Sequence, residues 1–370
     1  MEVTSLSLQF RSESSAFLRI ILLILVATLL AACNSASSSA PPNAPTAPAS
    51  DAVAKSGYHL ANKFTIGGDP GWDYIAIDPE ARRVYVTHFM KIEVLDADTG
   101  KSVGQITDTP GVHGIALVKG RGFTSNGKAD TVSVIDLKTN AHVAELKAGK
   151  KPDAITYDPG TDRVFVSNGD SDDVTVIDAS AAKVVATIPV GGAPEYSAGD
   201  GKGTVWVNLE DKNAFVTIDV KAMKLTKTTP IAGCEEPASM AFDSLNRRLF
   251  IGCKNNLLAI VDPDTGRVVK TLPIGEHVDA TVFDAANHLI FAPTGDGMLT
   301  IVHQDSADAY TIVDNVKTMR GAKTMALDPK TGKIFSATVE NVPATATAPP
   351  KPIGKVAYDA GPFVVITIEK

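Results

Sequence analysis

The chain has 370 residues, of which 44% are hydrophobic and 21% are charged, a balance typical of globular proteins rather than disordered or fibrous ones. Its formal net charge is −7 and no strongly basic stretch occurs, so nucleic acid is not an expected partner, because an acidic surface repels phosphate backbones. The length permits several domains unless the sequence consists of repeats, which can extend one domain over the whole chain.

Residues 1–32 are predicted to be a signal peptide. Arg11 and Arg19 supply positive charge, and the apolar run over 20–30 is short for a membrane span of about 20 residues. The tetrapeptide Leu30-Ala31-Ala32-Cys33 resembles the lipobox of bacterial lipoproteins. This resemblance implies cleavage before Cys33 and lipidation of its thiol. An ordinary signal peptide followed by an incidental cysteine is the alternative.

Residues 33–57 follow as a segment of Ser, Ala, Pro, Thr and Asn with almost no large apolar side chain. Such a segment cannot bury enough surface to offset the entropy of ordering it, so we expect a disordered tether. We therefore expect an exported protein that is anchored by its lipid to the bacterial cell envelope. Its folded domain, residues 58–370, would lie in the periplasm or at the cell surface.

A repeat of about 40 residues runs through this domain. A hydrophobic run that ends in aspartate recurs at intervals of 40 to 43 residues, and His303 stands one interval after the last of these aspartates, which are Asp96, Asp136, Asp178, Asp219 and Asp262. The segments between them are rich in β-branched and aromatic residues and have no helical periodicity. A period near 40 in an all-β pattern predicts the four-stranded blades of a β-propeller.

The first complete repeat divides into four short strands at 73–77, 83–87, 92–95 and 102–106. The last repeat begins at Gly321 and shows strands at 324–327, 333–337 and 363–368, but it has no fourth strand. Residues 58–68 resemble a fourth strand that lacks the other three. We therefore predict an all-β, seven-bladed propeller, with four antiparallel strands per blade, that is closed by the N-terminal strand.

Two segments resemble the tetrad that names the YVTN-repeat propellers: Val84-Tyr85-Val86-Thr87-His88 and Val164-Phe165-Val166-Ser167-Asn168. The Asp-Pro turn, the Val-Ile-Asp strand and the Val-Gly-Gly exit resemble the YncE-like branch of that family. The resemblance covers residues 58–370 and implies the propeller fold, while it leaves the function open. The sequence departs from the tetrad at Gly252-Cys253 and Ala292-Pro293, and the final repeat carries a Pro/Ala-rich insertion over 342–352.

The start of the first strand of each repeat is predicted to face the mouth of the central channel. Counting back from the following turn gives one position per blade, occupied in order by Asp73, His113, Asp153, Glu195, Ala238, Asp279 and Lys323. Further candidate ligand-binding residues on the same face are Trp72, His88, Asn126, Asn168, Glu235, Glu236 and Arg320. Trp72 is predicted to form an aromatic wall or a packing plug. Arg320 and Lys323 would hold an anionic group or neutralise nearby acids.

Carboxylates and imidazoles that converge from several blades suit a divalent metal such as Ca²⁺, Mg²⁺, Mn²⁺ or Zn²⁺. The candidate metal ligands are His88, His113, Asp153 and Glu195. Propellers similar to SMP-30 and gluconolactonase hold a metal at a comparable channel mouth, an analogy of architecture without matching ligand motifs. The alternative is a hydrated polar channel, in which each acid bonds neighbouring backbone N–H groups.

Cys234 and Cys253 remain as a pair once Cys33 is assigned to the lipid. Cys234 precedes the first strand of its repeat and Cys253 ends the second, so an antiparallel pairing of these strands brings the two thiols together. An exported protein meets an oxidising compartment, which favours a structural disulfide. The C-x-x-C spacing of redox motifs is absent.

Two functions remain from this pattern. The first is a monomeric binding module of the cell envelope whose ligand is a small molecule or an envelope protein, since no nucleophile–base arrangement or cofactor fingerprint is readable. The second is a divalent-metal-dependent hydrolase of the lactonase kind, in which Asp153 or Glu195 acts as the general base. Electron transfer is disfavoured because the sequence contains no C-x-x-C-H haem site.

Overall fold

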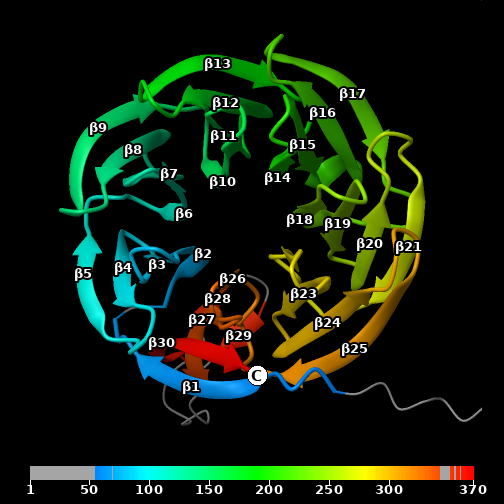
Figure 1. Cartoon of the computed structure of the whole chain (residues 1–370). Coiled ribbons are helices and arrows are strands. Elements are labelled where there is room, and N and C mark those ends of the chain that lie inside the picture. Colours follow the sequence, from blue (N-terminus) through cyan, green and yellow to red (C-terminus); the bar gives the residue numbers. More distant parts are fainter. Residues whose placement is uncertain (1–54, 69, 342–350, 354–355, 359) are drawn as a thin grey trace, which may run out of the picture. The chain divides into compact units, whose positions relative to one another are not determined.

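The computed structural model describes residues 55–68, 70–341, 351–353, 356–358 and 360–370. These residues form seven four-stranded sheets arranged in a ring, together with a small two-stranded hairpin, β28 (Lys351–Ile353) and β29 (Val356–Tyr358) (Figure 1). The prediction of an all-β, seven-bladed propeller is therefore confirmed. The predicted signal peptide, Cys33 and nearly all of the tether lie outside the described residues.

The strands of each blade run antiparallel from the centre of the ring to its rim. The innermost strands are β2 (Trp72–Asp78), β6 (Val112–Val118), β10 (Pro152–Asp158), β14 (Pro194–Gly199), β18 (Pro237–Asp243), β22 (Val282–Asp284) and β26 (Met325–Leu327). The second strands are β3 (Arg83–His88), β7 (Arg121–Asn126), β11 (Arg163–Asn168), β15 (Thr204–Leu209), β19 (Arg248–Cys253), β23 (Leu289–Thr294) and β27 (Ile334–Asn341).

The third strands are β4 (Lys91–Asp96), β8 (Thr131–Asp136), β12 (Asp173–Asp178), β16 (Ala214–Asp219), β20 (Leu257–Val261), β24 (Met298–Gln304) and β30 (Ala360–Glu369). The outer strands are β5 (Ser102–Ile106), β9 (Ala141–Lys147), β13 (Lys183–Pro189), β17 (Lys224–Pro230), β21 (Val268–Pro273), β25 (Tyr310–Lys317) and β1 (His59–Thr65). A short 3₁₀ helix, η1 (Glu210–Lys212), joins β15 to β16. No helix in the described ranges is long and apolar enough to cross a membrane.

Strand β1 closes the ring as the outer strand of the seventh blade. It pairs antiparallel with β30, from His59 opposite Glu369 to Thr65 opposite Val364, in a sheet of order β1-β30-β27-β26. Tyr58, directly before β1, is buried and donates a hydrogen bond to the carbonyl oxygen of Gly332 at 3.2 Å. The first and last parts of the described chain therefore share one sheet, as the sequence predicted.

One aromatic side chain per blade fills the space between neighbouring sheets. It stands at the same point of every second strand and is at most 1% exposed, and the seven residues are Tyr85, Phe123, Phe165, Trp206, Phe250, Phe291 and Phe335. Burying an aromatic side chain removes the largest apolar area that a single residue offers, so these seven positions contribute strongly to the packing of blade against blade.

The aspartate that recurs at the end of the third strands caps the turn into the outer strand. In the first blade the Asp96 carboxylate accepts hydrogen bonds from the backbone N–H groups of Asp98 and Thr99, and Asp136 and Asp262 do the same in their own turns. Aspartate favours such turns because its short side chain reaches backbone N–H groups two and three residues ahead. The aspartate that recurs in the sequence therefore marks the same turn in each of these blades.

The predicted disulfide is present. Cys234 and Cys253 are joined, their Cα atoms lie 5.4 Å apart, and both residues are buried. Cys253 ends β19, where it pairs with Pro237 at the start of β18. The bond therefore connects the loop that enters the fifth blade to that blade's second strand.

Candidate functional site

Five of the seven innermost strands begin with a β-bulge. In β2 the register shifts between Trp72 and Ile75, and equivalent shifts occur in β6, β10, β14 and β18. The hydroxyl of Thr87 stabilises the bulge in the first blade, since it accepts a hydrogen bond from the N–H of Asp73 at 3.1 Å and donates one to the Tyr74 carbonyl at 3.0 Å. Bulges commonly redirect side chains beside functional sites.

Asp73, His113 and Asp153 meet at the channel mouth from three consecutive blades. His113 Nδ1 lies 2.7 Å from Asp73 Oδ2 and 3.3 Å from Asp153 Oδ1. Because a carboxylate only accepts, Nδ1 carries the hydrogen in this arrangement. The side chains of Asp73, His113 and Asp153 are 20%, 29% and 15% exposed, so they remain in contact with solvent. One ligand atom from each lies within 4.8 Å of the others, which is compact enough to surround one cation.

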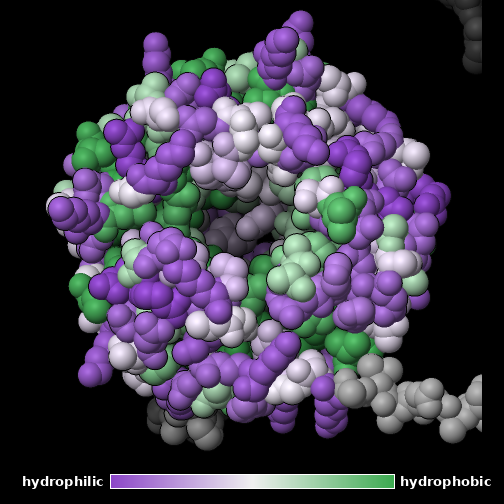
Figure 2. Space-filling model, viewed as in Figure 1, coloured by the Kyte–Doolittle hydropathy of each residue, from purple (hydrophilic) through white to green (hydrophobic). Residues whose placement is uncertain are grey.

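A second contact crosses the channel. The hydroxyl of Tyr74 in the first blade donates a hydrogen bond to Glu195 Oε1 in the fourth blade at 3.0 Å. The ring of Tyr74 also meets that of Tyr196 edge to face, with centroids 5.5 Å apart. The two tyrosines directly follow Asp73 and Glu195 in their strands. The centre of the ring is hollowed on the face shown in Figure 2.

The sixth and seventh blades contribute an ion pair, because Lys323 Nζ contacts Asp279 Oδ2. Lys323 also has a raised pKa: burial opposes its charge, but Asp279 and Asp73 more than offset that effect. Four carboxylates from four blades therefore share the channel with His113 and Lys323, and the charge of Lys151 also acts on Asp153.

The pKa values reflect this crowding. Burial, reinforced by the charge of Asp73, raises the pKa of Asp153 to about 6. Burial, followed by the charges of Asp153 and Asp279, raises the pKa of Glu195 well above its ordinary value. Burial lowers the pKa of His113, but the hydrogen bond to Asp73 and the charge of Asp153 outweigh it and leave that pKa raised. The cluster therefore holds protons tightly, as expected of acids that lack enough positive charge around them.

Small residues make room for these side chains. Gly114 occupies the position that Tyr74 has in the first blade, and a Cβ there would lie 3.5 Å from the Tyr74 ring and only 2.8 Å from Ile155. A Cβ at Gly127 would lie 2.8 Å from Nε2 of His113, too close for an ordinary contact. Glycine at 127 therefore permits the observed position of the imidazole.

His88 does not join the Asp73–His113–Asp153 group, although the sequence placed it near His113. Its Nδ1 lies 3.2 Å from Glu93 Oε1, and its ring stacks on Phe363 with centroids 4.3 Å apart. Glu93 also binds Lys91 at 2.8 Å and Gln105 at 3.0 Å. Burial opposes the charge of Glu93, but these hydrogen bonds together lower its pKa to about 2. His88 thus contacts Glu93 of the first blade and Phe363 of the seventh.

Asn126 and Asn168 also turn toward their own blades. Asn126 donates to the hydroxyls of Ser133 at 2.8 Å and Thr131 at 3.3 Å, while Asn168 donates to Thr175 at 2.9 Å and to a carboxylate in β12 at 2.7 Å. Both residues are fully buried. These bonds join the second and third strands of each blade. They favour a structural role for the two asparagines over the predicted ligand-binding role.

The remaining predicted residues lie apart from the group as well. Trp72 packs toward Phe363, with ring centroids 5.8 Å apart, and its Nε1 is buried with no hydrogen-bond partner in the described part of the chain. This favours the packing plug over the aromatic wall. Glu235 and Glu236 are exposed beside the disulfide, and Lys254 lies 3.9 Å from Glu236. Arg320 is exposed.

Sequence reasoning missed Tyr74, Tyr196 and Glu93. The two tyrosines stand one residue after aligned site positions, where the second and third blades have Gly114 and Ala154. At this aligned position some blades carry a large residue and others a small one, and this difference could have indicated the two tyrosines. Glu93 was detectable as the single acid at a position where β8 and β12 carry Ser133 and Thr175.

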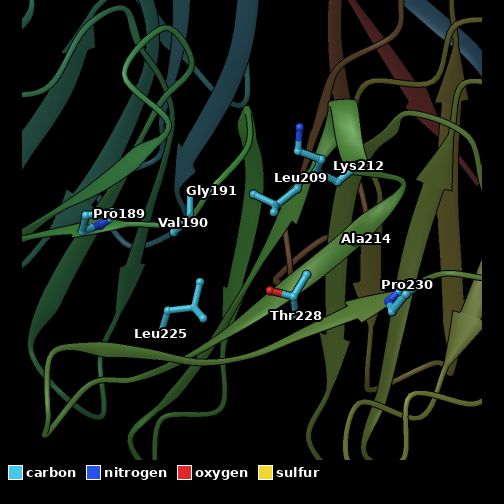
Figure 3. A pocket seen from close by; sticks show the side chains of 9 residues that line it. All are labelled: Pro189, Val190, Gly191, Leu209, Lys212, Ala214, Leu225, Thr228 and Pro230. Carbon is cyan, nitrogen blue, oxygen red and sulfur yellow. The ribbon is translucent and has the colours of Figure 1, made fainter.

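Two surface hollows lie outside the channel cluster. One, of about 500 Å³, lies between the third and fourth blades and is lined mainly by apolar groups, including Val190, Leu209 and Leu225, with Lys212 at its edge (Figure 3). The other, of about 450 Å³, lies beside β1 and includes Glu93 and Gln105. Neither contains the convergent ionisable groups of the channel mouth.

The comparisons with known proteins support the fold alone. No protein-family model and no curated protein matches the chain. Among solved structures, the Kuenenia stuttgartiensis hydrazine synthase is similar with a TM-score of 0.65 and 16% identity, over 74% of this chain and 94% of that one. The U3-55K structure is similar with a TM-score of 0.71 and 8% identity, over 84% of this chain and 99% of that one. The RRP9 WD40 repeats are similar with a TM-score of 0.70 and 8% identity, over 85% of this chain and 98% of that one. At these identities, the protein is similar to them as a β-propeller.

Proposed function

We propose that this protein is a lipid-anchored propeller of the bacterial cell envelope that binds a small, positively charged ligand at its channel mouth. The observation that carries the proposal is the meeting of carboxylates from four blades, Asp73, Asp153, Glu195 and Asp279, around His113 and Lys323. A cation that enters would replace protons on acids whose pKa values are raised, and so relieve their mutual repulsion.

The envelope part of the proposal rests on the N-terminal sequence. The Leu30-Ala31-Ala32-Cys33 tetrapeptide and the tether that follows have the pattern of a lipoprotein. The disulfide between Cys234 and Cys253 agrees with export to an oxidising compartment. The YVTN-repeat assignment is supported by the roles of its tetrad, in which Thr87 holds a bulge and Asn168 joins two strands.

Titration calorimetry of the purified full chain at pH 7.5 with Mn²⁺, Ca²⁺, Zn²⁺ and ethylamine tests the binding function. We expect at least one of these cations to bind, and we expect an Asp73→Asn, Asp153→Asn variant to lose that binding. Glu80→Gln is the matched control, since Glu80 is 82% exposed in a turn away from the channel mouth. Absence of binding to all four probes, or equal binding by the variant, would contradict the proposal.

Metal-dependent hydrolysis is the second candidate. It is favoured by one feature, the compact group of one imidazole and two carboxylates with Asp153 of raised pKa. A divalent ion held by Asp73, His113 and Asp153 would polarise a carbonyl. Glu195, which is not one of these three ligands, would then act as the general base. A screen of lactones and esters tests it. Turnover that requires added metal and disappears in His113→Ala would support this candidate, and absence of turnover would remove it.

A further inference from the structure

The sixth blade has two neighbouring histidines at positions where other blades carry charged residues. His303 stands one repeat after Asp262, at the position of the recurring aspartates. It lies in β24 opposite Leu289 of β23, and His288 directly precedes β23. Both histidines lie where the second strand begins, whereas the channel mouth lies where the second strands end. They are therefore separate from the channel cluster.

In two other blades, the residue before the second strand is an arginine that pairs with an acid. Arg82 donates hydrogen bonds to Asp98 at 2.6 and 3.3 Å, and Arg247 donates to Asp264 at 2.6 and 2.7 Å. The sixth blade keeps an acid at the matching position but has His288 in place of the arginine. A guanidinium is always charged and offers no lone pair to a metal, whereas a neutral imidazole offers one.

The turn after β24 does not need the imidazole of His303. In the first five blades, the recurring aspartate caps this turn through its carboxylate. In the sixth blade the backbone closes the turn, since the N–H groups of Asp305 and Ser306 donate to the Ala309 carbonyl at 2.9 and 3.2 Å. Turn chemistry therefore gives no reason for a histidine at this position.

Asp305, the acid that the sixth blade keeps, orients the ring of His303. His303 Nδ1 lies 2.7 Å from Asp305 Oδ1, and the hydroxyl of Thr311 donates to Asp305 Oδ2 at 2.7 Å. Because a carboxylate only accepts, Nδ1 carries the hydrogen and Nε2 carries the lone pair that a metal ion binds. Metal-binding imidazoles are commonly held by a carboxylate in this way. The His303 side chain is 40% exposed, so an ion from solvent can reach it.

The separation of the two rings suits a single ion. The centroids of His288 and His303 lie 6.4 Å apart. A metal–nitrogen bond is about 2.1 Å long and a ring nitrogen lies about 1.2 Å from its ring centre, so two imidazoles on one ion have centres up to about 6.5 Å apart. The Gln304 N–H donates to the His288 carbonyl at 2.9 Å, which fixes the spacing of the two backbones. His288 is exposed, so its ring is able to turn toward the ion.

We propose that His288 and His303 form a surface site for a divalent transition metal that favours imidazole ligands, such as Zn²⁺ or Cu²⁺. One nitrogen of each ring binds the ion, and water fills the remaining coordination positions. Asp305 is a positioning residue that acts through His303. The site is distinct from the channel mouth and does not rest on the proposed function.

Titration calorimetry of the full chain with Zn²⁺ at pH 7.5 tests this site. We expect Asp305→Asn to lower the Zn²⁺ affinity about tenfold, and His288→Asn and His303→Gln to lower it at least as much. Both histidines are at the surface, and asparagine tolerates the φ of +54° at residue 288, so the melting temperature should be kept. His142→Ala, which removes an exposed histidine of β9, is the control and should bind as the wild type does.

Pulsed EPR of the same proteins with equimolar Cu²⁺ identifies the ligands. We expect the nitrogen signals of two imidazoles in the wild type and in His142→Ala, and of one imidazole in His288→Asn or His303→Gln. Asp305→Asn should keep both imidazole signals although its affinity is lower, because it removes the charge that orients His303 and not a ligand. Loss of an imidazole signal in Asp305→Asn would contradict its positioning role.

The outcomes separate this site from the channel mouth. Zn²⁺ affinities of His288→Asn and His303→Gln equal to that of the wild type would overturn the inference, as would absence of Zn²⁺ binding. An effect in only one of these variants would also overturn it, because a single histidine would then hold the ion. Zn²⁺ held at the channel mouth would instead persist in both variants and disappear in Asp73→Asn, Asp153→Asn.

Discussion

At the scale of single residues, three side chains at the channel mouth have pKa values that weaken the fold as the pH rises. An acid whose folded-state pKa is raised holds its proton more tightly in the folded state, so ionising it above that pKa costs stability. This applies to Asp153 and Glu195. His113, whose pKa is also raised, adds stability below its ordinary pKa that is lost as the pH rises through the raised value. All three groups therefore make the folded protein less stable as the pH rises.

Replacing Asp153 by asparagine should therefore stabilise the protein at neutral pH. The free energy of unfolding of Asp153→Asn should equal that of the wild type near pH 4 and exceed it by about 2 kcal/mol above pH 7, because a pKa of about 6 replaces an ordinary value of 3.8 in the wild type. Urea unfolding between pH 4 and pH 8 measures the difference. A variant that is less stable than the wild type at pH 7.5 would refute this reading of the cluster.

At the scale of strands, the second and third strands of a blade are joined by one repeated polar contact. In the second and third blades an asparagine at the end of the second strand binds a hydroxyl two residues into the third, as Asn126 binds Ser133 and Asn168 binds Thr175. The first blade has His88 and Glu93 at the same positions. Both residues of the pair differ from those in the second and third blades. A contact between the two strands is therefore kept, but an imidazole and a carboxylate replace the amide and the hydroxyl.

A double-mutant cycle on His88→Asn and Glu93→Ser tests this equivalence. Each single substitution leaves one buried partner mismatched, whereas the double variant recreates the pair of the second blade. We expect a favourable coupling of about 1–3 kcal/mol between the two substitutions. Urea unfolding of the four proteins measures it. Strictly additive losses would show that His88 and Glu93 do not act as a pair.

The repeat spacing explains which parts of the site were predictable. Equivalent positions in successive blades lie at the same level of the channel, so alignment alone brought Asp73, His113 and Asp153 together. The same alignment does not tell toward which side a strand-end residue points, and His88 points toward Glu93 and the ring of Phe363. The contact between Tyr74 and Glu195 depends on the width of the channel, which no local spacing encodes.

At the scale of the whole molecule, the ring depends on the pairing of its two ends. The missing fourth strand of the last repeat and the isolated strand at the start of the domain predicted this closure from sequence. Without β1, the backbone of β30 would become an exposed sheet edge, which promotes association between chains. Tyr58, which packs against Phe291 with ring centroids 5.4 Å apart, would be lost with it.

A chain that starts at Gly67 should therefore unfold at a temperature at least about 10 °C lower than the full chain, since several kcal/mol of packing are removed. It should also form aggregates. A chain that starts at Lys55 keeps β1 and is the control, with an expected melting temperature equal to that of the full chain. Calorimetry and light scattering make the comparison. A monomeric, equally stable chain from Gly67 would show that β1 is not required for closure.

The most direct test of the central claim is a crystal structure of the protein at pH 7.5, soaked separately with Mn²⁺ and with ethylamine. The account predicts density for at least one of these cations in contact with the carboxylates of Asp73 and Asp153, with metal–oxygen or hydrogen-bond distances of about 2–3 Å. Density for neither cation at the channel mouth, with His113 still bonded to Asp73 as in the free protein, would contradict it.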